Sequence, residues 1–318
     1  MKMIRLMGFS LVALLVCSTL VHAETRVTYK SAKTSSSYYQ MAVQIAEAIK
    51  AGTNGEIIVT VEESQGSVQN VKEVLVRTGN YVFTTPPALI KLAQEGKGKF
   101  AGDDPAKYMN VRSLFPIPSL TMHFVVRADS GIKTFADLDG KTMLIGKGSF
   151  GAREAAKYFT LFGLDGKVKL ANAELGSAVQ ALKNRQIDGF ATSGSYPAPN
   201  VVEAAAGIGI NLLSLSPEQV KLTKRTELQI PAGTYPGVDY PVTTTSLPVV
   251  AYATTAMDDE TAYQLTKAFW EQKAKMAKSN AWWGGVSPAM LTNVYGKLHP
   301  GALRYYQESG VAIPDAIR

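Results

Sequence analysis

The sequence predicts an α/β protein built as two lobes, with two apolar strands that cross between them. Segments with the patterns of strands and helices alternate along nearly the whole chain, which is typical of parallel sheets covered by helices. The chain has 318 residues, a length at which a hydrophobic core usually divides. Two apolar extended segments, residues 122–126 and 247–254, separate a middle part from the two ends. We therefore expect one lobe from residues 24–124 plus 250–318 and a second from residues 125–249.

The first lobe is expected to begin with three strand–helix pairs. The strands are predicted at residues 27–29, 57–61 and 81–83. The helices are predicted at residues 38–50, 68–75 and 87–94. In the first helix, Met41, Ile45 and Ile49 recur at helical spacing and predict one buried face. The end of the chain is expected to return to this lobe as helices at residues 260–278, 288–295 and 300–308.

The second lobe is expected to repeat this order after the first crossing strand, which ends at Arg127. Thr134 is a suitable N-cap for a short helix at residues 135–138. Further strands are predicted at residues 142–145, 168–171, 187–191 and 208–213. Further helices are predicted at residues 152–162, 178–184 and 201–206, and a short one begins at Ser216. Residues 229–239 are rich in proline and glycine and are expected to be irregular.

The first 23 residues have the pattern of a cleaved secretory signal. Lys2 and Arg5 precede an apolar run at residues 6–20, and Val21-His22-Ala23 fits a small-x-small cleavage site. The run is too short for an ordinary membrane anchor, although a retained anchor is the alternative interpretation. The one cysteine, Cys17, lies inside this segment, so a mature chain would have no disulfide. We expect a periplasmic protein.

Charge and histidine content argue against several classes of function. The formal net charge is +7, but the basic residues are scattered and form no stripe of the kind that binds nucleic acid. His22 lies in the signal, and His123 and His299 are too far apart to form a recognisable metal motif. His299 is expected to cap the last helix. The sequence thus predicts no enzyme, no metal, no cofactor and no nucleic-acid partner.

A glycine-rich turn at residues 146–151 is the most distinctive motif. Its sequence, Gly-Lys-Gly-Ser-Phe-Gly, matches the dinucleotide fingerprint, and Glu174 stands where a ribose partner is possible. The turn lies in mid-chain without a second mononucleotide half, which disfavours that interpretation. A purely structural strand–helix turn is a second possibility. We favour a third, in which backbone N–H groups at a helix start cradle an anion, with candidate ligand-binding residues Gly148, Ser149, Phe150 and Gly151.

Polar loops at the ends of other strands suggest the rest of a ligand site. Four hydroxyl-bearing residues precede the helix at 38–50, whereas a helix cap needs only one hydroxyl. The candidates that these loops supply are Thr34, Ser36, Ser37, Tyr38, Ser67, Thr84, Thr85, Ser195 and Tyr196. Each alone is more often a cap or a turn residue. Together they predict a cleft rich in neutral hydrogen-bond donors.

An arginine is expected to hold the ligand's carboxylate, because a guanidinium can form two parallel hydrogen bonds to it. Arg127, at the end of the crossing strand, and Arg153, in the first turn after the glycine loop, are the candidates. Arg127 is equally compatible with an ion pair to Asp129, and Arg153 with exposure to solvent.

The most distinctive stretch near the end of the chain is residues 298–310, Leu-His-Pro-Gly-Ala-Leu-Arg-Tyr-Tyr-Gln-Glu-Ser-Gly. Other distinctive motifs are Thr234-Tyr235-Pro236-Gly237, Gly66-Ser67-Val68 with Asn70, Gly148-Ser149 and Tyr38-Tyr39. Through these motifs, and over nearly its whole length after the signal, the chain resembles the TAXI-type solute receptors of tripartite ATP-independent periplasmic (TRAP) transporters, with residues 298–310 as the strongest match. The chain departs from the family pattern at Ser35, Ser36, Phe150 and Pro86-Pro87.

The resemblance implies a periplasmic-binding-protein fold of type II-like topology, with the two crossing strands as its hinge. It adds Tyr235 to the candidate ligand-binding residues. It also implies a receptor that binds a small organic anion, glutamate-like or a 2-oxo dicarboxylate, and delivers it to TRAP membrane subunits. The paired polar loops and the absence of a metal motif lead us to expect a monomer. The rival functions are an exported oxidoreductase that uses the glycine turn, and a binding component of another transporter or of a sensor.

Overall fold

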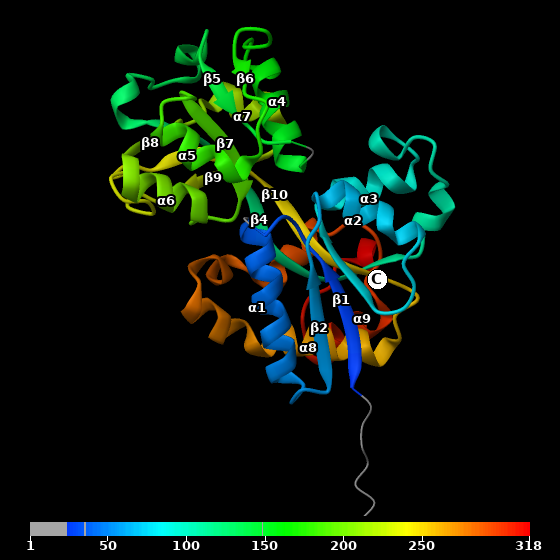
Figure 1. Cartoon of the computed structure of the whole chain (residues 1–318). Coiled ribbons are helices and arrows are strands. Elements are labelled where there is room, and N and C mark those ends of the chain that lie inside the picture. Colours follow the sequence, from blue (N-terminus) through cyan, green and yellow to red (C-terminus); the bar gives the residue numbers. More distant parts are fainter. Residues whose placement is uncertain (1–23, 35, 148) are drawn as a thin grey trace, which may run out of the picture.

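The computed structural model describes residues 24–34, 36–147 and 149–318, with the side chain of Phe150 excepted. The predicted signal at residues 1–23 and the loop residue Ser35 lie outside the described residues. Figure 1 shows two α/β lobes joined by two long strands, as the sequence predicts. Within the described residues, no helix is both long and apolar enough to cross a membrane.

The first lobe combines the beginning and the end of the chain. Its strands are β1 (Thr25–Lys30), β2 (Ile57–Glu62) and β3 (Tyr81–Thr85). Its helices are α1 (Ser37–Gly52), α2 (Ser67–Lys72), α3 (Pro87–Gln94), α8 (Asp259–Ser279) and α9 (Pro300–Glu308). Helix α8 packs against α1 and α9 packs against α8, so the end of the chain closes the core that its beginning opens.

The second lobe is formed by the middle of the chain. Its strands are β5 (Thr142–Leu144), β6 (Lys169–Leu170), β7 (Gly189–Gly194), β8 (Ile210–Leu212) and β9 (Thr226–Ile230). Its helices are α4 (Phe150–Leu161), α5 (Ala178–Lys183), α6 (Pro199–Ile208) and α7 (Pro217–Thr223). The predicted irregular segment at residues 229–239 is wrong at its start, because β9 reaches Ile230 and pairs with β10.

A single ten-stranded sheet runs through both lobes in the order β2-β1-β3-β10-β4-β7-β5-β6, with β8 on β4 and β9 on β10. The pairs β1–β2, β1–β3, β5–β6 and β5–β7 are parallel, as the alternating sequence predicts. Strands β4 (Val111–Arg127) and β10 (Val242–Thr254) are antiparallel and cross between the lobes. Thr121 lies at the junction, since it pairs with Ser246 of β10 and with Gly194 of β7.

The crossing ribbon of β4 and β10 contains an irregularity at two prolines and is longer than the segments that the sequence predicts. Ile117 is opposite Val249 and Leu120 is opposite Leu247, so Pro118 and Ser119 face the single residue Pro248. Such a bulge is where a strand tolerates proline. The Pro118 carbonyl at this bulge accepts a hydrogen bond from the Tyr38 hydroxyl at 2.9 Å. The ribbon is thereby fixed to the first turn of α1.

Candidate functional site

A cavity of about 310 Å³ lies between the two lobes. Its lining comes from the loops that follow β1, β2, β5, β6 and β7, together with the helix starts that these loops lead into. All of these strands take part in parallel pairs. Open α/β sheets bind ligands at the carboxyl ends of their strands, so the cavity is where the topology predicts a binding site.

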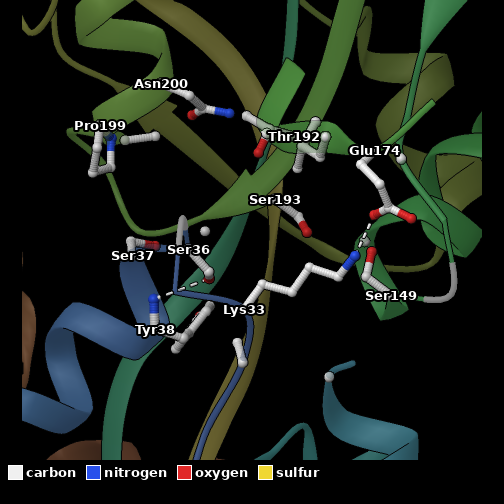
Figure 2. Close-up of a pocket in the computed structure, with 18 of the residues that line it drawn as sticks. Lys33, Ser36, Ser37, Tyr38, Ser149, Glu174, Thr192, Ser193, Pro199 and Asn200 are labelled. Atoms are coloured by element: carbon white, nitrogen blue, oxygen red, sulfur yellow. Dashed lines mark hydrogen bonds and ion pairs between the residues drawn. The ribbon is translucent and has the colours of Figure 1, made fainter. Parts of the chain in front are cut away.

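The first lobe supplies a wall of hydroxyl groups at the start of α1. The Ser36 side chain caps this helix by accepting a hydrogen bond from the Tyr38 N–H at 3.2 Å. Ser37, the first helical residue, is buried, and its Oγ would lie 2.6 Å from a Cβ added to Gly194 of the other lobe. Ser67, at the start of α2, also lines the cavity. The two lobes therefore approach each other closely beside Ser37 (Figure 2).

The second lobe supplies a wall around the start of α4. Ser149 is the N-cap of this helix, and its Oγ accepts a hydrogen bond from the Ala152 N–H at 3.0 Å. A Cβ added to Gly151 would lie 1.7 Å from the Ser193 Oγ, so only glycine lets α4 approach β7 this closely. Thr192 and Ser193 line the cavity beside it. The last glycine of the turn is thus explained by helix–strand packing.

The cavity wall combines three helix starts with side-chain charges of both signs. Helices α1, α4 and α6 all begin at its wall, and the first N–H groups of a helix have no acceptor within the helix. Lys33 and Lys147 add two positive charges, and Glu174 and Glu203 add two negative ones. Lys33, from the first lobe, reaches across to the Glu174 carboxylate of the second lobe (Figure 2). The hydrogen bond from Lys33, and the charges of Lys33 and Lys147, hold the pKa of Glu174 below its ordinary value.

The structure brings six of the predicted ligand-binding residues together in this cavity. They are Ser36, Ser37, Tyr38, Ser67, Ser149 and Gly151. Gly148 lies outside the described residues, as does the side chain of Phe150. The other predicted residues do not appear among those that line the described cavity: Thr34, Thr84, Thr85, Arg127, Arg153, Ser195, Tyr196 and Tyr235.

Neither predicted arginine faces the cavity. The Arg127 Nε donates to Asp129 Oδ1 at 2.8 Å, and its Nη1 donates to the Leu182 carbonyl at 3.2 Å. Arg153 lines a second, more open groove that it shares with Lys72 and Lys99. Partial burial lowers the pKa of the Arg153 guanidinium. Among the described residues, the basic side chains that line the cavity are those of Lys33 and Lys147.

Two predicted threonines hold the strands behind the site in place. The Thr84 hydroxyl donates to the Tyr29 hydroxyl at 3.0 Å, and Thr85 is fully buried. Asn70 Nδ2 donates to the carbonyls of Ser31 at 2.7 Å and Thr84 at 2.8 Å, which ties the ends of β1 and β3 to α2. These contacts position the cavity wall and leave the side chains out of the cavity.

Sequence reasoning missed part of the lining. The missed residues with polar side chains are Lys33, Gln65, Lys147, Thr192, Ser193, Asn200 and Glu203. Glu174 was considered only as a ribose partner, whereas the structure pairs it with Lys33. Lys33 and Lys147 belong to the same two loops whose serines were predicted, so loop membership was the signal that could have identified them. Among the described residues, no three His, Cys, Asp or Glu side chains gather as they would around a metal ion.

The structure has the two-lobed α/β fold that is found in periplasmic binding proteins. The structure of the periplasmic binding protein BugD matches with a TM-score of 0.56 and 12% identity, covering 92% of this chain and 99% of that one. A protein described as a periplasmic transporter matches with a TM-score of 0.54 and 12% identity, covering 80% and 86%. A putative sulfonate-binding protein, SsuA from Methylobacillus flagellatus KT, matches with a TM-score of 0.50 and 15% identity, covering 91% and 88%. Because the sequence identities are 12–15%, these similarities show a shared fold and nothing about the ligand.

The sequence itself gives the family. Residues 30–310 match the NMT1-like family, which is nearly all of the described chain. The protein therefore belongs to the NMT1-like family.

Proposed function

We propose that this protein is a periplasmic solute-binding protein that captures a small organic anion and delivers it to a membrane transporter. The observation that carries this proposal is the cavity between the lobes, where three helices begin and two lysines are present. Helix N-termini and lysines both favour negative charge. A volume of about 310 Å³ suits a small ligand.

Hydroxyl groups from both lobes would complete the recognition of a carboxylate. Ser36 and Ser149 cap α1 and α4, so their backbone positions are fixed before any ligand binds. Ser37 and Ser193 come from opposite lobes and line the same cavity. Contacts from both lobes are required for a ligand to favour the closed arrangement over an open one. The site therefore has the parts of a receptor that closes around its ligand as a monomer.

The transporter class in this proposal rests on the resemblance to TAXI-type receptors, which serve TRAP permeases. The sulfonate-binding neighbour is described as part of an ABC transporter, so the fold alone is compatible with either class. Reconstitution with a TRAP membrane complex, and separately with an ABC importer, distinguishes the two. Uptake that depends on this protein and on a sodium gradient, without ATP, is the result expected for the TRAP class.

Ligand binding should stabilise the folded protein. A ligand present at about 100 times its dissociation constant adds roughly 2.7 kcal/mol to the free energy of unfolding. Thermal unfolding should be measured with L-glutamate, 2-oxoglutarate and a panel of other carboxylates and sulfonates. A rise in melting temperature with at least one organic anion is expected. A response to NAD, with none to any organic anion, would contradict the proposal.

Removing Lys33 and removing Glu174 should have opposite effects on anion binding. Lys33→Gln should weaken binding of L-glutamate or 2-oxoglutarate by about tenfold, since one charge-assisted hydrogen bond of about 1.4 kcal/mol is lost. Glu174→Gln should strengthen binding, because the carboxylate that now pairs with Lys33 no longer competes with the ligand. Calorimetric titration measures both effects, and Lys50→Gln, at the exposed end of α1, is the charge-matched control. If Glu174→Gln binds more weakly than the parent, Glu174 contacts a cationic group of the ligand and the anion assignment is incomplete.

A further inference from the structure

A chain of buried hydrogen bonds links the crossing strand β4 to the wall of the cavity. His123 lies in β4 and Tyr235 in the segment between β9 and β10, and both side chains are buried. The Tyr235 hydroxyl lies 2.7 Å from His123 Nε2. The same hydroxyl oxygen accepts a hydrogen bond from the Ala198 N–H at 2.9 Å. Ala198 is the N-cap residue of α6 and lines the cavity.

The donor and the acceptor of each hydrogen bond in this series follow from the partners of His123. His123 Nδ1 lies 3.1 Å from the Thr121 carbonyl oxygen, which can only accept, so Nδ1 carries the proton. A neutral imidazole then has Nε2 as an acceptor, and the Tyr235 hydroxyl donates to it. The tyrosine oxygen keeps its lone pairs for the Ala198 N–H. Each donor therefore has one acceptor, with no alternative arrangement for neutral His123.

This series of hydrogen bonds begins at the junction between the lobes and ends at the cavity. Thr121 is the residue at which β4 passes from its partner β10 to its partner β7. At the other end, the N-cap residue Ala198 and the α6 residues Pro199, Asn200 and Glu203 line the cavity. Figure 2 shows Pro199 and Asn200 there. Pro199 has no N–H, so the Ala198 N–H is the donor through which the backbone before α6 is attached to Tyr235.

We propose that His123 and Tyr235 are positioning residues for the ligand cavity, which hold the first turn of α6 against the ligand through the Ala198 N–H. The inference rests on the proposed function, because it assumes that the ligand occupies this cavity. Tyr235 thus does not line the cavity and acts on it through the backbone at the start of α6. His123 fixes the tyrosine hydroxyl in the one orientation that leaves its oxygen free to accept.

The first test uses the protein without ligand. In Tyr235→Phe, amide hydrogen exchange at Ala198 should rise by tenfold or more, while His123 keeps its proton on Nδ1, where the Thr121 carbonyl still accepts it. Tyr240→Phe is the matched control, because its hydroxyl bonds Leu212 of β8 and lies in the same segment of the chain. Exchange at Ala198 that is equal in the two variants overturns the proposal. So does an increase spread evenly over α5, α6 and α7.

The second test keeps the tyrosine. Glutamine at position 123 still offers an acceptor to the Tyr235 hydroxyl, and leucine does not. His123→Gln should therefore keep slow exchange at Ala198 and bind L-glutamate within about twofold of the parent, whereas His123→Leu should lose protection there and bind about tenfold more weakly. These two variants test the positioning role even if Tyr235→Phe fails to fold. Equal exchange at Ala198 and equal affinity for L-glutamate in the two variants contradict the proposal. If L-glutamate does not bind the parent, the choice of ligand fails, and exchange at Ala198 still decides the positioning role.

Discussion

Replacing Gly301 with alanine should lower the free energy of unfolding by about 3 kcal/mol. Gly301 lies in the first turn of α9, and a Cβ at this position would lie 2.0 Å from the Asp259 carbonyl oxygen and 2.7 Å from the Tyr263 backbone nitrogen. Both atoms belong to the backbone of α8, which cannot move aside as a side chain can. Alanine is a better helix former than glycine by up to about 1 kcal/mol, so the clash has to exceed that gain.

Thermal or urea unfolding measures this loss, and Gly207→Ala is the control. Gly207 lies in α6, where an added Cβ would meet no atom within 4 Å. Gly207→Ala should therefore be neutral or slightly stabilising, by up to about 1 kcal/mol. Equal effects of the two substitutions would show that α9 does not lie against α8 as described.

The protein should lose about 3 kcal/mol of stability between pH 6.5 and pH 4 through His123 alone. Burial lowers the pKa of His123 from 6.5 to about 4, against a smaller opposing effect of its hydrogen bond to the Thr121 carbonyl. Between these pH values the unfolded chain binds a proton that the folded protein does not bind, so stability falls as the pH falls. Each pKa unit corresponds to about 1.4 kcal/mol.

The comparison of the parent with His123→Gln isolates this effect. Urea unfolding should be measured at several pH values from 7 to 4. His299 is also buried with a lowered pKa, but it is present in both proteins and its contribution cancels. The stability difference between the parent and the variant should shrink, or change sign, toward pH 4. A difference that is constant with pH would mean that His123 has the same pKa in the folded and the unfolded protein.

Much of the fold could be predicted because the helices and strands of each lobe have local sequence patterns, such as apolar stripes and helix caps. The stripe of Met41, Ile45 and Ile49 predicts a helix, and all three side chains are fully buried in α1. His299 was expected to cap the last helix, and its side chain accepts from the Gly301 N–H at 3.3 Å. These features depend on residues close together in the chain, so the sequence shows them directly.

The elements that were missed are those whose partners are distant or whose side chains face solvent. Strand β9 has only Ile230 buried, so it lacks the apolar alternation that marks a strand. The first half of β4 contains Pro116 and Pro118, which argue against a strand unless a bulge is known to lie there. That bulge exists only in the pairing with β10, more than a hundred residues later.

The cavity residues that were predicted are likewise those with a local sequence signal. Ser36 and Ser37 were found because a run of hydroxyl-bearing residues before a helix start is visible in the sequence, and Ser149 because it lies in a glycine-rich turn before a helix start. Lys33 was missed as a cavity residue, because its partner Glu174 is brought near only when the lobes face each other. Arg127 was expected in the cavity but lies outside it. The reason is local, because its guanidinium forms an ion pair with Asp129, two residues away.

The division of the first lobe between the two ends of the chain has a consequence for biosynthesis. The strands and helices of the second lobe are consecutive in the chain and can complete their core while the ribosome is still at work. The first lobe cannot, because the face of α1 that packs against α8 has no cover until residues 259–279 have been made. The first hundred residues therefore remain an incomplete domain until α8 has been synthesised. A chain that terminates after β10 lacks a wall of its amino-terminal lobe, although every residue of the second lobe is present.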